Sequence, residues 1–422
     1  MNQTTSHQIN ENEPNTAEKP ALKRSPYIRY SAIMFLFYFA ISVTAYVSVY
    51  LEANGMNGTG IGTIMSISAL IGAVTLPLWG LMSDKLRSPR TALVICLMIN
   101  AILFVLVPVT LRVYIGPVLL SSVLITLSMG FRGPCNNLVI GWMVKESTMS
   151  GINYSSVRLW GSVGYSLMLI LLSVIVPLWG INVIFFLCVA LTGLLILMCY
   201  SVKEDKLSVQ QRPTVKELRI SRLFRNYYFM GYLGLIVAMV IYDAITMVYI
   251  PFLIKDVSAD TALTGLVVGI RALFEMGIML TIVFFKKRIA LPYLLVAAGI
   301  LFGIEHMLYP YAGNMRSILL ISMISGVASG VYLGLGPSYV LSIVPPELNT
   351  TAQALCGSIM MATFIAGSFV GGVLMDRFGV RNLLFGCGLV IFGITALFVF
   401  SLYLGRRVLK VDTPPSVMKP IG

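Results

Sequence analysis

The sequence predicts an all-α polytopic membrane protein, with twelve transmembrane helices arranged as two six-helix bundles. Hydrophobic residues make up 57% of the 422 positions, charged residues make up only 11%, and the mean hydropathy is +0.87. A soluble protein of this length needs far more polar surface than that. Apolar runs of about 20 residues, the length at which a helix crosses a ~30 Å hydrocarbon core, recur along the chain.

The expected spans follow these apolar runs in order, at 28–51, 60–82, 91–109, 114–143, 157–177, 181–201, 228–254, 263–285, 290–311, 316–344, 350–375 and 382–404. The longest polar interruption, 202–227, is densely charged and divides the spans into two groups of six. This division predicts two bundles, 28–201 and 228–404, joined by a cytoplasmic linker, with a solute site between them near the middle of the membrane. A twelve-helix receptor or scaffold without internal symmetry is the alternative.

The 30 Lys and Arg residues are distributed unevenly over the expected loops. With the N-terminus in the cytoplasm, most of them lie on the cytoplasmic side. The few on the outer side are Arg112, Lys255, Arg316, Arg377 and Arg381. This asymmetry follows the positive-inside rule, which explains the net charge of +13 better than nucleic-acid binding does. The polar segments 1–27 and 405–422 are expected to be cytoplasmic tails, the first one disordered and without a cleavable signal sequence.

The sequence gives little support to cofactor or metal chemistry. All six cysteines fall within apolar spans and form no CxxC pair, so we interpret them as small core hydrophobes. The two histidines, His7 and His306, cannot form a metal cluster by themselves. P-loop, HExxH and GxSxG motifs are absent from the sequence. We therefore expect no cofactor, no metal site and no enzymatic activity.

The segment "GLMSDKLRSPR" after the second span combines a glycine, an acid and several cations at fixed spacing. These residues are Gly80, Asp84, Lys85, Arg87 and Arg90. The segment resembles the loop 2–3 signature of the major facilitator superfamily and departs from it at Ser88-Pro89. Gly80 is expected to let two helices approach, Asp84 to cap a neighbouring helix, and the cations to pair across a cytoplasmic gate. A merely basic loop would not explain the glycine and acid.

A similar string, "GGVLMDRFGVR" at 371–381, looks like a second copy of this signature. The span count places it after span 11, on the outer side. The positional equivalent in the second half is "FKKRIA", which keeps the cations but has no Asp. We therefore expect 376–381 to form an outer-end turn and not a cytoplasmic gate.

Within the superfamily, several stretches resemble the branch of lactose permease, the nucleoside:proton symporters and the phenylpropionate transporters. "RLWGSVGY" at 158–165 is similar to the fifth helix of that branch, and 338–355 with 371–379 is similar to its passage from helix 10 to helix 11. The resemblance covers essentially 28–404. It implies the major facilitator fold, with two bundles that rock to give alternating access, and proton-coupled uptake of a small polar solute.

Six ionisable residues fall inside the expected spans, three of each sign. An ionisable side chain in a span costs about 2.5–3.5 kcal/mol on insertion scales, so each is a functional candidate. These residues are Arg132, Arg158, Asp243, Arg271, Glu275 and Glu305.

Arg158 begins a polar stripe on the expected fifth span, because Ser162 and Tyr165 follow at i+4 and i+7. Such a stripe suits a cavity that binds a hydroxylated or anionic solute. The resemblance places Arg158 on the solute-binding Arg of the branch, Ser162 on its small neighbour and Tyr165 on its stacking aromatic. Alternatively, Arg158 anchors the helix at the cytoplasmic interface, since the apolar run after it already spans the membrane.

Arg132 lies mid-span just before Gly133-Pro134, where a kink is expected to free backbone groups to line a cavity. In lactose permease, the position three after this proline holds a carboxylate that works with the fifth-helix Arg. Here that position is Asn137. The departure favours an anionic or strongly polar solute. A structural charge pair is the alternative role of Arg132.

The second half carries the expected proton-coupling residues. By resemblance, the Tyr242-Asp243 pair matches one in helix 7 of lactose permease, and Glu275 matches a helix-8 Glu. Glu305 stands where the branch has an Arg, and Leu333 replaces its helix-10 His. We therefore expect a relocated relay, in which Arg271 supplies the positive charge and Glu275 or Glu305 carries the proton. An internal Arg271–Glu275 ion pair is the alternative, and His306 is expected to be a packed polar residue.

These features predict a multi-pass protein of the cell (inner) membrane with both termini in the cytoplasm. The expected function is secondary active transport, most simply proton-coupled symport of a sugar, nucleoside or organic acid by a monomer. A drug or metabolite exporter of the same fold is one alternative. A non-transporting sensor of transporter ancestry is another, because the helix-10 His is missing and Asn137 replaces a carboxylate.

Overall fold

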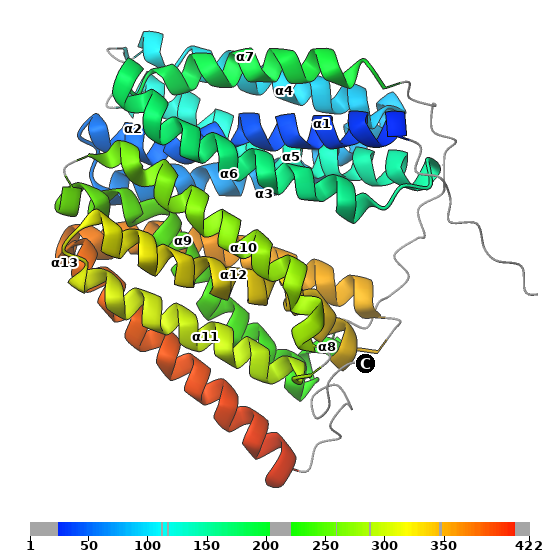
Figure 1. Cartoon of the computed structure of the whole chain (residues 1–422), viewed down its shortest axis with the longest axis vertical. Helices are drawn as coiled ribbons and strands as arrows, with labels where there is room; N and C mark the ends of the chain where they lie inside the picture. Colours follow the sequence, from blue (N-terminus) through cyan, green and yellow to red (C-terminus); the bar gives the residue numbers. More distant parts are fainter. Residues whose placement is uncertain are drawn as a thin grey trace, which may run out of the picture.

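The computed structural model describes residues 24–110, 113–115, 118–202, 221–258, 260–286, 288–345 and 348–409. Within these ranges the chain forms two six-helix bundles, which Figure 1 shows as a blue-to-green half and a green-to-red half. The prediction of twelve spans in two bundles is confirmed. Most of the expected tails and linker lie outside the described residues, since the first helix begins at Arg24, the second half begins at Ser221 and the last helix ends at Arg407.

Six spans make up the N-terminal half, the first of them a helix interrupted by a 3₁₀ turn. Their elements are α1 (Arg24–Ile41), η1 (Ser42–Tyr46), α2 (Val47–Ala53), α3 (Gly58–Leu86), α4 (Pro89–Val105), α5 (Leu120–Met149), α6 (Tyr154–Trp179) and α7 (Val183–Cys199). Side-chain caps fix three of the helix starts: Asn57 for α3, Ser88 for α4 and Asn153 for α6 each accept a hydrogen bond from a backbone N–H of the first turn.

The fourth span begins later than predicted. A short 3₁₀ turn, η2 (Pro108–Thr110), and a two-stranded hairpin, β1 (Tyr114–Ile115) and β2 (Val118–Leu119), precede it. The backbone N–H of Leu120 donates to the carbonyl of Val113 at 2.8 Å. The hairpin and this bond use backbone groups that a helix starting at 114 would have paired internally.

The C-terminal half also contributes six spans, two of which are continuous in α13. Its elements are α8 (Ser221–Phe224), α9 (Tyr227–Ser258), η3 (Thr261–Leu263), α10 (Thr264–Lys286), α11 (Leu291–Leu308), η4 (Tyr309–Tyr311), α12 (Met315–Ile343) and α13 (Asn349–Arg407). Gly379 breaks α13 with φ 78° and ψ 161°, a conformation that favours glycine. The break divides α13 into two arms, which are the eleventh and twelfth spans.

The bundles are packed internally and against each other. In the N-terminal half α1 lies on α6, and α5 lies on α3 and α4; in the C-terminal half α9 lies on α13, and α10 lies on α12. The most extensive contacts between the halves are those of α3 with α13 and of α6 with α10; α9 also contacts α2 and α3. One hydrophobic core fills the N-terminal bundle, and a second core runs from the C-terminal bundle into residues of η1, α2, α3 and α6. The positions of the residues at the α3–α13 and α6–α10 contacts therefore depend on how the two halves pack against each other.

The halves are tied together at one end of the molecule, which we call the joined end. There, Asp376 of α13 accepts hydrogen bonds from the backbone N–H groups of Gly58 and Thr59, at 2.8 Å each, and from the Thr59 hydroxyl at 2.6 Å. A carboxylate at this position satisfies the first donors of α3 and complements the helix dipole. Lys255 of α9 forms an ion pair with Glu52 of α2.

Close backbone approach supports these bonds at the joined end. A Cβ atom on Gly372 would lie 2.4 Å from the carbonyl oxygen of Gly58, so the crossing of α3 and α13 requires glycine. Tyr46 of η1 donates to the carbonyl of Ala262 at 2.6 Å and accepts from the N–H of Gly265 at 2.9 Å. In Figure 1 the two halves lie together at this end and diverge toward the end that holds the α3–α4 loop.

Candidate functional site

Two adjoining cavities lie between the halves. The first has a volume of about 380 Å³ and is lined mainly by α1, α3, α5 and α6, with two residues of α13. The second has a volume of about 330 Å³ and is lined mainly by α9, α10, α12 and α6. Tyr38, Arg158 and Tyr165 line both cavities. The two cavities together form the candidate site, and its size suits a small solute.

Arg158 lies at the boundary of the two cavities, and its guanidinium has two neighbours. Its Cζ lies 4.0 Å from the centre of the Tyr38 ring, a cation–π contact, and its Nη1 donates to the Ser162 hydroxyl at 3.3 Å. Gly161 makes room for this arrangement, because a Cβ there would lie 2.5 Å from the Tyr38 ring. The structure thus brings together Arg158, Ser162 and Tyr165, as the stripe predicts, with their side chains at the cavities.

Arg132 and Asn136 of α5 line the first cavity. Asn136 accepts a hydrogen bond from the Tyr38 hydroxyl at 2.6 Å through its Oδ1 atom. The placement of Asn137 in the site is a correction. Asn137 is exposed, and its amide donates to the carbonyl of Gly133 in its own helix at 3.1 Å. Asn136 shares a helix face with Arg132 because it lies four residues further on. Asn137 is the next residue and is rotated by about 100° about the helix axis from Asn136.

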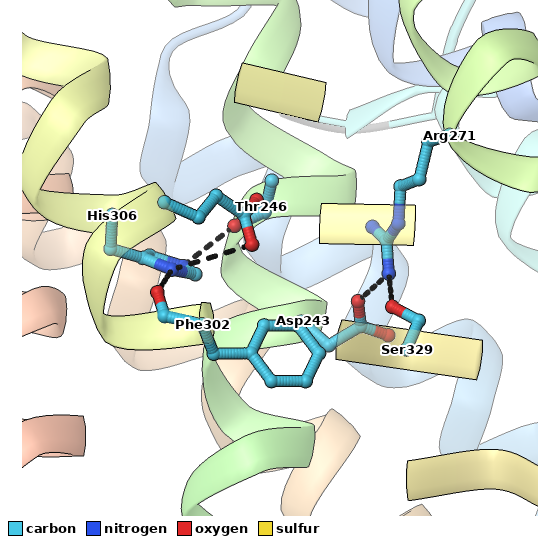
Figure 2. Close-up of polar contacts among 7 residues, drawn as sticks. Asp243, Thr246, Arg271, Phe302, His306 and Ser329 are labelled. Atoms are coloured by element: carbon cyan, nitrogen blue, oxygen red, sulfur yellow. Dashed lines mark hydrogen bonds and ion pairs between the residues drawn. The ribbon is translucent and has the colours of Figure 1, made fainter. Parts of the chain in front are cut away.

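The opposite wall carries a buried network around Arg271, shown in Figure 2. The guanidinium of Arg271, on α10, forms an ion pair with Asp243 of α9 and donates to the Ser329 hydroxyl of α12 at 2.7 Å. Arg271 is only 5% exposed. The described residues form no Arg271–Glu275 ion pair, and Nη2 of Arg271 is directed instead to α9 and α12. Asp243 compensates the charge, which is what a buried cation requires.

Glu275 lines the second cavity together with Arg158 and Tyr332. It makes no hydrogen bond or ion pair with any other residue that the structure describes. Arg158 of α6 and Glu275 of α10 face the same cavity from the two halves, and this places opposite charges across the candidate site.

A second buried cluster lies behind this wall, around His306 of α11. Its Nδ1 is 2.8 Å from the carbonyl oxygen of Phe302, and its Nε2 is 2.8 Å from the Thr246 hydroxyl (Figure 2). Because a carbonyl can only accept, Nδ1 carries a proton and donates to Phe302. Tyr242, expected in the solute site, instead packs edge-on against His306 with ring centres 5.9 Å apart.

Glu305 belongs to the same cluster. Its side chain is fully buried, and both carboxylate oxygens lack a hydrogen-bond partner of good geometry among the described residues. The His306 ring is the nearest basic group, with Nδ1 at 3.9 Å. The structure therefore keeps Glu305 apart from the solute cavities, whereas Glu275 borders one of them. The described residues include no group of three or more His, Cys, Asp or Glu that could hold a metal ion.

The family described as "MFS_1 like family" matches residues 27–385 of this sequence. The chain belongs to this family. It is a multi-pass membrane transporter of the major facilitator superfamily, and the expectation that it is not an enzyme is confirmed by the nature of its relatives.

Curated relatives match this chain at low identity, over most of its length or over a part of it. The maltose permease of Geobacillus stearothermophilus is 24% identical over 364 residues, which are 81% of this chain and 86% of the permease. A putative sugar efflux transporter of Deinococcus radiodurans is 24% identical over 136 residues, 32% of this chain and 35% of its own length. Among solved structures, the nucleoside transporter NupG superposes with a TM-score of 0.75 at 16% identity, covering 89% of this chain and 99% of NupG.

The family signature loop adopts a specific geometry in this member. Arg87 caps α3 in the left-handed region, with φ 52°, and Arg90 donates to the carbonyl of Val202 at 2.8 Å. Lys85 is exposed, and Asp84 lies in the last turn of α3. The expected role of Gly80 in close helix packing is not seen, since a Cβ there would meet open space. The cap at Arg87 and the bond from Arg90 both lie within the N-terminal half, so a gating role for this loop stays a prediction.

Three residues of the site were missed by the sequence reasoning. Asn136 had a usable signal, because it lies four residues after Arg132 on one helix face. Ser329 and Tyr38 had none, because a serine or tyrosine within an apolar span is common and carries no charge. Only the packing of α1 on α6 and of α10 on α12 places them next to the two arginines.

Proposed function

We propose that this protein is a secondary active transporter that moves a small polar solute through the candidate site by alternating access, coupled to protons. The single observation that carries this proposal is a pair of adjoining cavities lined from both halves by charged residues, in a molecule whose halves are tied together at one end. A rocking motion about such a site exposes it to each side in turn. The names of the maltose permease and of NupG support a sugar- or nucleoside-like solute.

The proposed topology gives the side to which the site is open. With the basic loops in the cytoplasm, the joined end faces outward, and the site in this conformation is accessible from the cytoplasmic side. We propose that the protein works in this orientation as a monomer in the cell (inner) membrane and takes up its solute. The putative sugar efflux transporter supports the opposite direction, export, as the second candidate.

Proton coupling is proposed for Glu275 and Glu305. Glu305 is fully buried and has the Ser325 and Tyr309 hydroxyls beside it but no cation in hydrogen-bond contact. Ionising it there is unfavourable, so we infer that it is protonated in this conformation. A movement of α11 that brings water or a cation to Glu305 would release the proton. Glu275 faces the solute cavity and is placed to sense both the solute and Arg158.

Transport by purified full-length protein in liposomes tests the proposal. Radiolabelled maltose, uridine and glucuronate represent a sugar, a nucleoside and an organic acid, and a pH gradient, acidic outside, is imposed. We expect at least one solute to accumulate and to carry protons inward. Accumulation only under the reversed gradient would show export, and no movement of any of them would favour the sensor alternative.

The variants Glu275→Gln and Glu305→Gln test the coupling separately from transport. Each is expected to retain exchange of solute across the membrane and to lose solute-driven proton movement. Asp256→Asn is the matched control, because it removes an exposed carboxylate outside the two cavities. Unaltered proton movement in both variants would rule out the assigned relay.

A further inference from the structure

We propose that the solute is an anionic sugar derivative, a polyhydroxy carboxylate whose acidic group docks on the wall formed by α1, α5 and α6. This inference rests on the proposed function and specifies the solute of that same site. Two arginines line the first cavity, and the residues lining this cavity include no Asp or Glu.

The charge of this wall is uncompensated in the described part of the protein. Neither Arg132 nor Arg158 forms an ion pair with any described residue, whereas Arg271 on the opposite wall is paired with Asp243. Two guanidinium groups that line one cavity without an acid raise the positive potential there and favour an anion. Glu275 faces Arg158 only across the second cavity, so the partner that this wall can take in the first cavity is a group of the solute. Guanidinium forks are well matched to a carboxylate.

Tyr38 makes the same wall a surface of hydrogen-bond donors. Its hydroxyl donates to Oδ1 of Asn136 and takes one of the two lone pairs of that oxygen. The N–H groups of Asn136 stay available to a solute. The polar groups offered at this wall by Arg132, Asn136 and Arg158 are therefore donors, which suit the oxygens of a carboxylate.

The opposite wall offers the complementary chemistry. Glu275 lines the second cavity and provides carboxylate oxygens, which accept hydrogen bonds from hydroxyl groups, while Asp243 in the same lining is paired with Arg271. The Glu275 carboxylate repels the acidic end of the solute and so fixes its orientation. Tyr165 borders both cavities and presents an aromatic ring on which the apolar face of a sugar can lie.

A neutral sugar fits this arrangement poorly. It would supply hydroxyl groups to Glu275 but would leave Arg132 and Arg158 without a negative partner. The two walls together therefore favour a solute with one acidic end and a hydroxylated body, of a length that reaches from the first cavity to the second.

The experiment measures binding to the purified full-length protein, by thermal shift and by calorimetry, with three matched probes. Glucuronate carries the acid, glucuronamide is its neutral counterpart and glucose lacks the group. Since a ligand stabilises the state that it binds, we expect glucuronate to raise the melting temperature and to bind roughly tenfold or more tightly than either neutral probe. Inorganic phosphate is measured in parallel, and equal stabilisation by phosphate would contradict the requirement for a sugar body.

Substitutions locate the effect on the proposed wall. Arg132→Gln and Arg158→Gln are each expected to abolish the preference for glucuronate over glucuronamide. Arg316→Gln is the matched control, because it removes the same charge from an exposed position outside both cavities. Arg316→Gln is expected to keep the preference unchanged.

The outcomes separate this inference from the proposed function. Binding of neutral probes as tight as that of glucuronate, or loss of the preference in Arg316→Gln as well, overturns the inference and leaves the transporter proposal intact. Failure of glucuronate to bind, while maltose or uridine binds, has the same meaning. Failure of every probe, together with absent transport in liposomes, counts against both.

Discussion

The two walls of the candidate site use arginine in opposite ways. On the α10 side, Arg271 is buried and neutralised by Asp243, and Ser329 accepts a further hydrogen bond from the same nitrogen. On the α5–α6 side, Arg132 and Arg158 face the cavities, and Arg158 is held by an aromatic ring and a hydroxyl and not by an acid. An arginine within this membrane protein is therefore a structural group where the chain supplies its counter-charge, and in the proposed function a binding group where it does not.

The largest effect, on stability, is expected from removing the charge of Arg271, the arginine that is neutralised by an acid. Arg271→Gln leaves Asp243 as a buried charge without its cation, so we expect the free energy of unfolding to fall by about 3 kcal/mol. The double variant Arg271→Gln/Asp243→Asn removes both charges and is expected to recover most of that loss. Thermal unfolding in detergent measures both variants. A double variant as unstable as the single one would show that the pair does more than neutralise charge.

A smaller effect is expected on the cationic side from Arg158→Lys. The ammonium keeps the charge but loses the planar fork that contacts Tyr38 and Ser162, so affinity for glucuronate is expected to fall roughly tenfold. Stability should hardly change, in contrast to Arg271→Gln. Isothermal calorimetry gives the affinity, and wild-type binding by Arg158→Lys would support the interpretation of Arg158 as an interfacial anchor.

The smallest effect is expected from Tyr38→Phe, which keeps the ring over Arg158 and removes the hydrogen bond to Asn136. A single neutral hydrogen bond contributes about 0.5–1.5 kcal/mol, so a loss of affinity of a few-fold is expected. Tyr38→Leu removes the ring as well and should reduce binding further. If Tyr38→Phe and Tyr38→Leu were equivalent, the ring contact with Arg158 would contribute nothing to the site.

Much of the architecture was predictable from the sequence because hydropathy and charge are local properties. Apolar runs long enough to cross a membrane marked the spans, and the charged segment 202–227 marked the division into halves. The cost of an intramembrane charge singled out Arg158, Arg271 and Glu275, all of which line the cavities. The fourth span was placed too early, because the strands at 114–115 and 118–119 are as apolar as a helix start.

The details of the site depend on the packing of helices that are distant in sequence. The position of Arg271 within an apolar run indicates that its charge needs an acidic partner. Which acid forms the ion pair, Asp243 and not Glu275, is decided by the packing of α9, α10 and α12. Likewise, an arginine at 158 follows from the sequence, but the ring of Tyr38 reaches it because α1 packs on α6 with Gly161 at the crossing. The physical reason is that hydrophobicity is a property of each segment alone, whereas the partner of a charge depends on which helix faces which.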